Sequence, residues 1–225
     1  TEGREVVDPK VQNDNVTKEL FHPALMPSHK GLGRLIVWWQ QRHPGLNVLL
    51  AKKDIADAFK WLWLLAESAG LFSTSFSKGQ ASLQQDLILI WLVLNLGWRG
   101  GPGYFVQFGT LLKLLHANFK PQDTAYNDSV AFRSAIWMDD LVVAEPNIGS
   151  RPQISLGVAE ALIKKLFGEK ALNLSKDLVE GLLETRKLTW GLIYDTITMT
   201  RALPDPKLEK AAYLLALPSF DFGIF

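Results

Sequence analysis

The distribution of hydrophobic and polar positions divides the chain into short helices and strands. Five stretches are rich in apolar residues and are either bounded by glycine or proline or apolar at helical spacing, which predicts helices. They are residues 35–41, 56–70, 104–119, 154–167 and 204–217. The last of them is amphipathic, so one of its faces is expected to be buried.

The intervening apolar stretches predict strands. They are residues 46–50, 86–96, 131–138, 141–144 and two small strands within 188–200. Period alone also allows a helix over 86–96. The runs 131–138 and 141–144 flank the pair Asp139-Asp140 like the arms of a β-hairpin. Residues 71–85 predict a loop or an exposed hairpin, and 97–103, with four glycines and a proline, predict a loop. Strands and helices alternate, which indicates an α/β or α+β fold.

Composition narrows the class of protein. The chain has 225 residues, of which 48% are hydrophobic and 21% charged, so a substantial core can form and intrinsic disorder is excluded. There is no cysteine, which excludes disulfides, thiolate metal sites and cysteine nucleophiles. The net charge of +1 argues against a protein that coats nucleic acid with its whole surface. It does not exclude a local basic groove.

The chain shows no signal for a membrane or for export. Its first residues are charged, and the most apolar run, 87–94, is far shorter than the ~20 residues that span a bilayer. We therefore expect no membrane partner and an intracellular location, cytoplasmic or nuclear.

Three carboxylates lie in apolar surroundings, where an unpaired charge is unfavourable. Asp54 follows a predicted strand, and Asp139 and Asp140 form the tip of the predicted hairpin. If these strands are neighbours in one sheet, the carboxylates converge and supply the oxygen ligands that Mg²⁺ prefers. Without further context, a hairpin turn at Asp139-Asp140 and a helix N-cap at Asp54 are the simpler interpretations.

Six short stretches, in order along the chain, resemble the motifs of reverse transcriptases. They are residues 4–13, 53–59, 96–105, 137–140, 172–176 and 189–192. Each stretch is a weak match alone, but their order and intervals together make a specific pattern. Leu96 stands where retroviral enzymes carry glutamine and many retrotransposon enzymes an apolar residue. The resemblance is therefore to LTR-type or related retroelements.

The resemblance implies an α+β fold, namely a polymerase palm with a small antiparallel sheet flanked by helices. Residues 1–53 would be a partial fingers segment, and 54–200 the palm, with room for a fingers insertion near 71–96. Residues 201–225 would begin the thumb or form a connecting helix, so the thumb is largely absent. Further domains, a thumb and a ribonuclease H, would belong to a parent polyprotein.

The activity implied is RNA-directed DNA polymerisation, in which dNTPs are added to a primer 3′ end on an RNA or DNA template. Asp54, Asp139 and Asp140 would be catalytic and would bind Mg²⁺, with Mn²⁺ as the alternative and the carbonyl of Ile55 as a further ligand. One metal would activate the primer hydroxyl, and the other would neutralise the pyrophosphate.

The resemblance also implies residues that bind the dNTP. Phe59 would be the steric gate that excludes a ribose 2′-hydroxyl, and the backbone amides of Asp57, Ala58 and Phe59 would cradle phosphates. The simpler interpretation of Phe59 is core packing. Glycines that include Gly97 would let the loop 97–103 approach the nucleotide closely.

Two cations complete the set. Arg4 would bind the triphosphate through its guanidinium, and Lys176 would assist the leaving pyrophosphate. Each could equally be a solvated surface residue. The pairs Lys52-Lys53 and Lys164-Lys165 have two interpretations as well, contacts to a phosphate backbone or solvated faces.

Three alternatives to the polymerase remain open. The first is a non-catalytic, degenerate or domesticated polymerase fold that binds nucleic acid or protein, which the near-neutral charge and the missing thumb favour. The second is an RNA-templated RNA polymerase, against which Phe59 argues. The third is an unrelated domain whose motifs match by chance.

Overall fold

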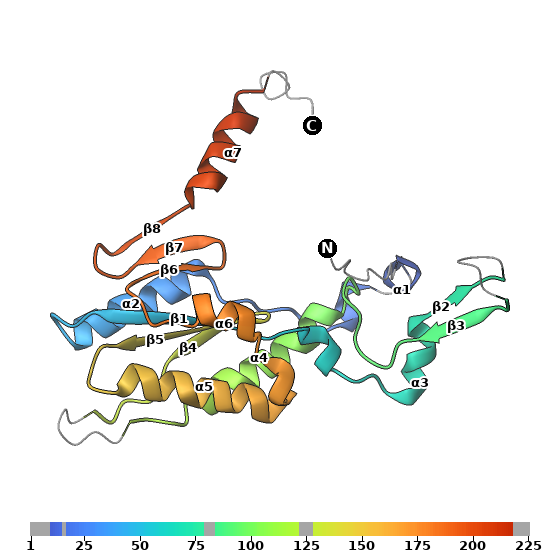
Figure 1. Ribbon diagram of the computed structural model, residues 1–225, viewed down its shortest axis with the longest axis horizontal. Coiled ribbons are helices and arrows are strands. Elements are labelled where there is room, and N and C mark those ends of the chain that lie inside the picture. The colour runs from blue at the N-terminus through green and yellow to red at the C-terminus, as the bar shows by residue number, and fades with distance from the viewer. Residues whose placement is uncertain (1–9, 15–16, 79–83, 122–127, 218–225) are drawn as a thin grey trace.

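A three-stranded antiparallel sheet forms the centre of the chain. The computed structural model describes residues 10–14, 17–78, 84–121 and 128–217. The sheet has the order β1-β5-β4, with β1 at Val48–Asp54, β5 at Asp140–Pro146 and β4 at Ser134–Trp137 (Figure 1). Strands β4 and β5 are the two arms of the predicted hairpin, and β1 is the neighbour of β5.

Alternating side chains of β5 supply two hydrophobic clusters, one on each face of the sheet. Leu141 and Val143 join the cluster of helices α4 (Gly101–His116) and α5 (Arg151–Phe167). Val142 and Ala144 join the cluster of helix α2 (His29–Arg42). Because both faces are covered, the central strand is almost wholly apolar, as expected of a strand buried on two sides.

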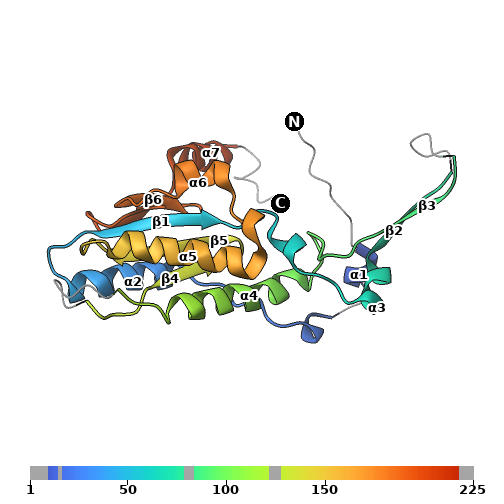
Figure 2. The same cartoon turned by 60° about the horizontal axis from the view of Figure 1, so that its bottom comes forward.

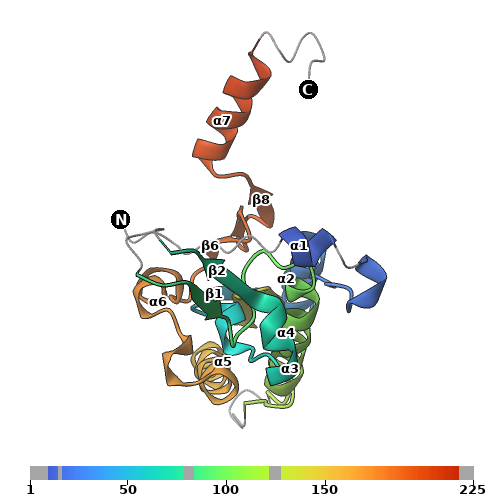
Figure 3. The ribbon, with the colours of Figure 1, turned by 90° about the vertical axis from the view of Figure 1, so that its right-hand side faces the viewer.

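The C-terminal part of the chain forms a second sheet and two helices. The sheet consists of β6 (Arg186–Thr189), β7 (Leu192–Asp195) and β8 (Thr200–Ala202) in that order. Helix α6 (Leu174–Glu180) lies beside β1, and helix α7 (Asp205–Leu215) extends away from the body (Figures 1 and 3). None of the described residues of α7 is buried.

The remaining elements project from the opposite end of the molecule. They are the short helices α1 (Lys10–Asp14) and α3 (Ala66–Ala69), the 3₁₀ turns Lys18–Leu20, Ala58–Trp61 and Gly70–Phe72, and the strands β2 (Ser73–Phe76) and β3 (Leu87–Ile90). Strands β2 and β3 form a two-stranded ribbon that reaches furthest from the central sheet (Figure 2). The 3₁₀ turn Glu169–Ala171 follows α5 within the body.

The fold class and most of the predicted elements are confirmed. The architecture is α+β, with small antiparallel sheets and flanking helices. Helices are present at 35–41, 104–119, 154–167 and 204–217 with shifted ends, and β2 and β3 form the exposed hairpin expected near residues 71–85. Helix α4 begins at Gly101, inside the predicted loop, because Pro102 at its start lacks an N–H that would need a partner.

The predicted helix over 56–70 is wrong. The chain forms a 3₁₀ turn at Ala58–Trp61, and helix α3 holds only Ala66–Ala69. Asp57 has a φ of +53°, a left-handed conformation that a helix cannot contain. The indole of Trp61 donates to the carbonyl of Ala56, which fixes this turn by a local side-chain bond. Tertiary contacts thus override the helical propensity of the Ala- and Leu-rich stretch.

The predicted buried strand over 86–96 is also wrong in its burial and length. Strand β3 holds only Leu87–Ile90, and all four of its side chains are exposed. Its single neighbour is β2, and no helix packs on either face of this ribbon among the described contacts. A continuous apolar run is typical of a strand buried inside a sheet. Strand β3 instead belongs to a two-stranded ribbon outside the core, so its apolar side chains are exposed.

Candidate active site

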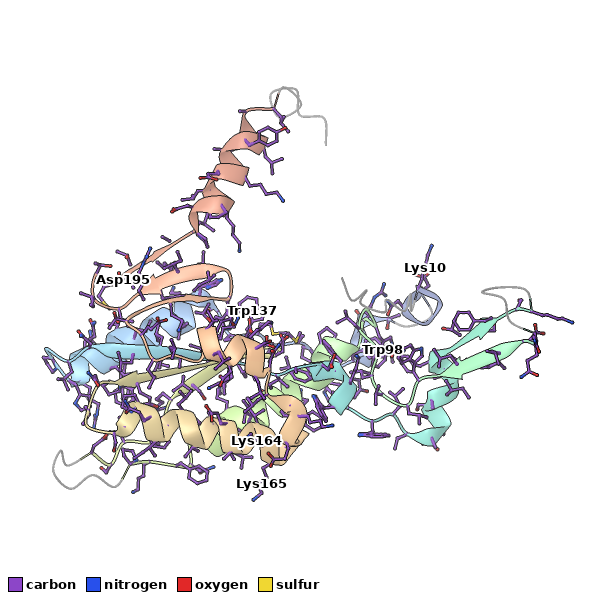
Figure 4. All side chains as sticks on the ribbon, viewed as in Figure 1. Lys10, Trp98, Trp137, Lys164, Lys165 and Asp195 are labelled. Carbon is purple, nitrogen blue, oxygen red and sulfur yellow. The ribbon has the colours of Figure 1, made fainter. Side chains whose placement is uncertain are left out.

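The three acidic residues lie together where β1 ends and β5 begins. Asp54 is the direct cross-strand partner of Asp140, and the backbone N–H of Ile55 donates to the carbonyl of Asp139 over 2.9 Å. Met138 precedes them in the hairpin turn with a φ of +53°, which reverses the chain so that β5 begins at Asp140. Trp137 marks this turn within the body of the molecule (Figure 4). Residues more than eighty positions apart thus form one cluster.

This cluster is partly withdrawn from water. Asp54 is 7% exposed, while Asp139 and Asp140 are half-buried. Burial raises the pKa of the Asp139 carboxyl, and repulsion from Asp54 raises it further. Burial also raises the pKa of the Asp140 carboxyl, although the nearby Lys52 ammonium opposes the shift. Crowded carboxylates that resist ionisation are typical of sites that bind a cation.

Lysine 52 provides a cation at Asp140. Its Nζ lies 3.1 Å from Oδ1 of Asp140 and 2.7 Å from Oε2 of Glu180 on α6, and its side chain is 11% exposed. Burial alone would lower the pKa of Lys52, but the bonds to Glu180 and Asp140 raise it overall. The ammonium therefore remains charged and neutralises one of the three acids.

A second cation, Lys176, pairs with Asp54. Its Nζ donates to Oδ1 of Asp54 over 2.6 Å, and the amide of Asn173 donates to Oδ2 over 3.0 Å. Asn173 is also the N-cap of α6, because its side chain accepts the N–H of Lys176. The hydrogen bond to Asp54 raises the pKa of Lys176. The cap therefore aims both side chains at Asp54, a role the sequence did not predict for Asn173.

Lysine 53 fastens α5 and α6 to the sheet. Its Nζ pairs with Glu160 on α5 at 2.5 Å and with Asp177 on α6, and its side chain is 3% exposed. Of the two interpretations drawn from the Lys52-Lys53 pair, the solvated face is wrong, while contact to a phosphate backbone stays a prediction. Lys53 is buried and Lys52 is nearly so, and acids that follow far along the chain neutralise them.

The oxygen atoms of the three acidic residues suit a divalent ion, but two of the three carboxylates are paired with lysines. Three carboxylates and backbone carbonyls are the oxygen ligands that Mg²⁺ takes. Within the part of the chain that the structure describes, no group of three or more His, Cys, Asp or Glu side chains is arranged to hold a metal ion. Lys52 pairs with both Asp140 and Glu180, and Lys176 pairs with Asp54.

The residues predicted to contact the nucleotide lie next to the carboxylates along the chain. Phe59 is half-buried, with its ring 5.4 Å from the ring of Phe105, and a Cβ on Gly101 would meet it at 3.3 Å. Ala58 is buried, whereas Asp57 is exposed and pairs with Lys60 at 3.1 Å. Core packing and a gate are both compatible with Phe59, since the residue packs against the core and is only half-buried.

The glycine loop is tied to the N-terminal segment. The side chain of Asn13 donates to the carbonyl of Gly97 over 3.0 Å and accepts the N–H of Arg99 over 2.6 Å. Gly97 has a φ of +95°, which only glycine adopts readily. Trp98 stacks on Tyr104 on the side of the projecting ribbon (Figure 4). Arg4, the predicted triphosphate ligand, lies outside the described residues.

Of the comparisons with known proteins, the one with solved structures finds matches. No protein-family model and no curated protein matches the sequence. The structure of the foamy viral protease-reverse transcriptase in complex with an RNA/DNA hybrid matches with a TM-score of 0.57 and 16% identity, and the match covers 91% of this chain and 22% of that one. A foamy viral protease-reverse transcriptase dRH in complex with double-stranded DNA matches with a TM-score of 0.56 and 15% identity, over 92% of this chain and 29% of that one.

These matches show that the chain has a reverse-transcriptase-like fold. The identities are too low to carry activity across, and the chain spans less than a third of either matched protein. No helix among the described residues is long and apolar enough to cross a membrane.

Proposed function

We propose that the chain is the fingers–palm part of an RNA-directed DNA polymerase from an LTR-type or related retroelement. It would extend a primer 3′ end with dNTPs on an RNA or DNA template. The observation that carries the proposal is the convergence of Asp54, Asp139 and Asp140 at one end of the β1–β5 pair, on a reverse-transcriptase-like fold.

The three carboxylates and the carbonyl of Ile55 would hold Mg²⁺, or Mn²⁺ in its place. When bound, these ions would make the primer hydroxyl a better nucleophile and neutralise the departing pyrophosphate. Asp140 would have to exchange its bond to Lys52 for the metal, and Asp54 its bond to Lys176. The released Lys176 ammonium, 46% exposed, would then face the triphosphate.

Other residues of the chain would contact the nucleotide directly. The half-buried Phe59 ring would exclude a ribose 2′-hydroxyl. The backbone amides of Asp57, Ala58 and Phe59 would receive phosphate oxygens, as would Arg4. The open backbone at Gly97 would approach the base pair. Because the 3₁₀ turn at Ala58–Trp61 is short, these amides would act as single donors without a helix dipole behind them.

The division into domains is part of the same proposal. Residues 1–53 would belong to the fingers, 54–200 to the palm, and 201–225 to the start of a thumb or a connecting helix. The ribbon of β2 and β3, within the predicted insertion at 71–96, would extend the fingers. A complete thumb and a ribonuclease H would come from the parent polyprotein.

Primer extension tests the proposal directly. The wild-type chain is incubated with a primer annealed to a defined RNA template, dNTPs and Mg²⁺, beside Asp139→Asn and the exposed control Asp205→Asn. We expect extension by wild type and control, and a loss of at least about 100-fold in Asp139→Asn, because a metal ligand contributes several kcal/mol to the transition state. Equal extension by all three proteins would contradict the proposed role of Asp139.

The steric gate has its own experiment. In Phe59→Ala, incorporation of ribonucleotides relative to deoxynucleotides is expected to rise, because the space beside C2′ is no longer filled. Phe105→Leu, which changes the neighbouring ring inside the core, is the matched control. A wild-type chain that prefers ribonucleotides would favour an RNA polymerase instead.

One observation favours a second candidate, a non-catalytic polymerase-fold module that binds nucleic acid. The two ammonium groups already neutralise Asp54 and Asp140, as they would in a chain that takes no metal. Calorimetric titration with Mn²⁺ separates the candidates. Binding that is lost in Asp139→Asn supports the polymerase, whereas no binding by the wild-type chain supports the module.

A further inference from the structure

One face of α2 carries a stripe of cations. Lys30, Arg34, Trp38 and Arg42 follow one another at intervals of four residues, so they lie on the same face of the helix. All four side chains are exposed. From Lys30 to Arg42 the stripe runs for about 18 Å, at 1.5 Å per residue. The net charge of the whole chain gives no hint of this local concentration.

A groove runs beside the stripe and adds a further cation. Its volume is about 570 Å³, and it lies between α2 and the hairpin of β7 and β8. Lys30, Arg34 and Trp38 line it from the helix, and Tyr194 and Arg201 line it from the strands. Pockets of this size hold small ligands, so one or two nucleotides would fit.

Two guanidinium groups lie over the ring of Trp38, one from the stripe and one from outside it. Arg42 lies over its ring at 5.7 Å and Arg133 at 5.2 Å, both measured to the ring centroid. The tryptophan is 36% exposed. It therefore offers an aromatic surface inside a ring of positive charge.

The cations of this face have no acidic partner among the residues that the structure describes. Lys30, Arg34, Arg42, Arg133 and Arg201 form no ion pair with any residue in the described ranges. Asp195 is the single acid among the residues that line the groove. Its Oδ1 already accepts the N–H groups of Ile197 and Thr198, at 3.0 and 2.9 Å. Five unpaired cations on one face attract a polyanion.

The stripe begins near the candidate active site. His29, directly before Lys30, has its ring 5.7 Å from the ring of Trp137 and 6.1 Å from that of Trp190. Trp137 adjoins the hairpin turn that carries Asp139, and the indole of Trp190 donates to the carbonyl of Asp140. A nucleic-acid strand bound along α2 would therefore lead away from the carboxylates.

We infer that the α2 face and its groove bind a single-stranded segment of nucleic acid. Lys30, Arg34 and Arg201 contact the phosphates, and Trp38 stacks against a base. Cations spaced along a groove with an exposed aromatic are what sequence-tolerant binding of single strands requires. This site is separate from the carboxylates and needs no metal, so it does not depend on catalysis.

Fluorescence anisotropy in EDTA tests the inference. The probe is a labelled oligothymidylate of about 16 nucleotides. The triple variant Lys30→Gln/Arg34→Gln/Arg201→Gln is compared with wild type and with Lys164→Gln/Lys165→Gln/Lys170→Gln, which removes the same charge from the end of α5. Lys164 and Lys165 lie on the far side of the molecule from Asp195 (Figure 4).

The expected results follow from counterion release. Three lost phosphate contacts make the slope of log affinity against log salt shallower by about 2, and weaken binding at about 0.1 M salt by about 100-fold. The α5 variant and the charge-preserving Lys30→Arg/Arg34→Lys/Arg201→Lys keep the wild-type slope. Trp38→Ala weakens binding by about 5- to 100-fold, while Trp38→Phe retains most of it.

Four outcomes would overturn the inference. They are no binding by the wild-type chain, equal weakening by the α2 and α5 variants, unchanged affinity in Trp38→Ala, and polyglutamate competing as well as oligothymidylate. The last would indicate an acidic protein surface as the partner. Because no metal is present, failure here is distinguishable from failure of primer extension, and thermal melting of each variant confirms that it is folded.

Discussion

Strand β5 carries a carboxylate near each end, and the two ends hold their charges in different ways. Glu145 is fully buried and belongs to a cluster with Arg151 and Asp128, which are 1% and 6% exposed. Asp140, at the other end, is half-buried and shares its surroundings with Asp54. Both ends thus place acids in a protein interior, where unpaired charges are unfavourable.

At the Glu145 end the hydrogen-bonding groups of the arginine are largely filled. The Nε of Arg151 donates to Glu145 over 2.6 Å, and Nη1 donates to Asp128 over 2.7 Å. The remaining donors reach the carbonyls of Val130 and Ala131, and the guanidinium lies 4.5 Å above the ring of Trp39. The planar fork of arginine suits such multiple contacts, so this cluster has little reason to rearrange.

At the Asp140 end the cations are lysines, each a single point charge on a flexible stem. Lys52 and Lys176 hold Asp140 and Asp54, while Asp139 has no cation within ion-pair distance among the described residues. A divalent ion could replace either ammonium without breaking a helix or a strand. The contrast indicates that the arginine cluster is structural and that the lysine-paired acids are available for binding.

The largest expected effect is the removal of the arginine. Arg151→Met should lower the free energy of unfolding by about 3–5 kcal/mol, because it leaves Glu145 and Asp128 buried without their partner. Urea unfolding measures the change, and the exposed Arg186→Met is expected to stay within about 0.5 kcal/mol of wild type. If the two variants lost equal stability, the cluster would not be the structural anchor proposed here.

The pH dependence of Glu145 is the next largest effect. Burial raises the pKa of Glu145 from 4.5 to about 7, so between these pH values the folded chain keeps a proton that the unfolded chain has released. The free energy of unfolding of wild type, relative to Glu145→Gln, should therefore fall as pH rises through this window, by about 1–3 kcal/mol. Unfolding in urea at a series of pH values measures both free energies. If the stability of wild type relative to Glu145→Gln rose with pH, the predicted sign would be wrong.

A smaller loss is expected at the lysine end. Lys52→Gln should destabilise the fold by about 1–2 kcal/mol, because Asp140 and Glu180 lose a nearly buried cation but remain in partial contact with water. Divalent ions should stabilise Lys52→Gln more than they stabilise wild type, and so restore part of the stability that the variant lost. Thermal melting with and without Mn²⁺ measures this, and identical shifts would mean that Lys52 does not compete with the metal.

The sequence predicted the hairpin of the acid cluster because its parts are local. Trp137 to Asp140 contain both the turn and the acids, and the hydrophobic runs on either side predict the two arms of the hairpin. Local turn chemistry and alternation, which short windows contain, were sufficient for this feature. The pairing of Asp54 with Asp140 is not local, and the sequence predicted it only on the condition that the two strands are neighbours.

The charges around the cluster could not be predicted in the same way. The partners of Lys52 and Lys53 lie on α5 and α6, more than a hundred residues further along the chain, so adjacent lysines resembled a solvated pair. The stripe on α2 was missed for a different reason. The predicted helix began only at residue 35, whereas the helix begins earlier, after Ser28, whose hydroxyl caps it by accepting the N–H of Gly31.

The smallest expected effect has the opposite sign from the others. Asp139→Asn should leave stability unchanged or raise it by up to about 1 kcal/mol at neutral pH. The physical reason is that burial and the nearby Asp54 raise the pKa of Asp139, so its ionised form destabilises the folded chain.

The sign of this effect can be followed with pH. Below the unfolded pKa of 3.8, Asp139 is protonated in both states and Asp139→Asn should match wild type. As pH rises through the raised folded pKa, wild type loses stability relative to the variant, and the difference then stays constant. Urea unfolding between acid and neutral pH measures the curve. A destabilised Asp139→Asn would show that a cation holds this acid as well, and the contrast between the two ends of β5 would disappear.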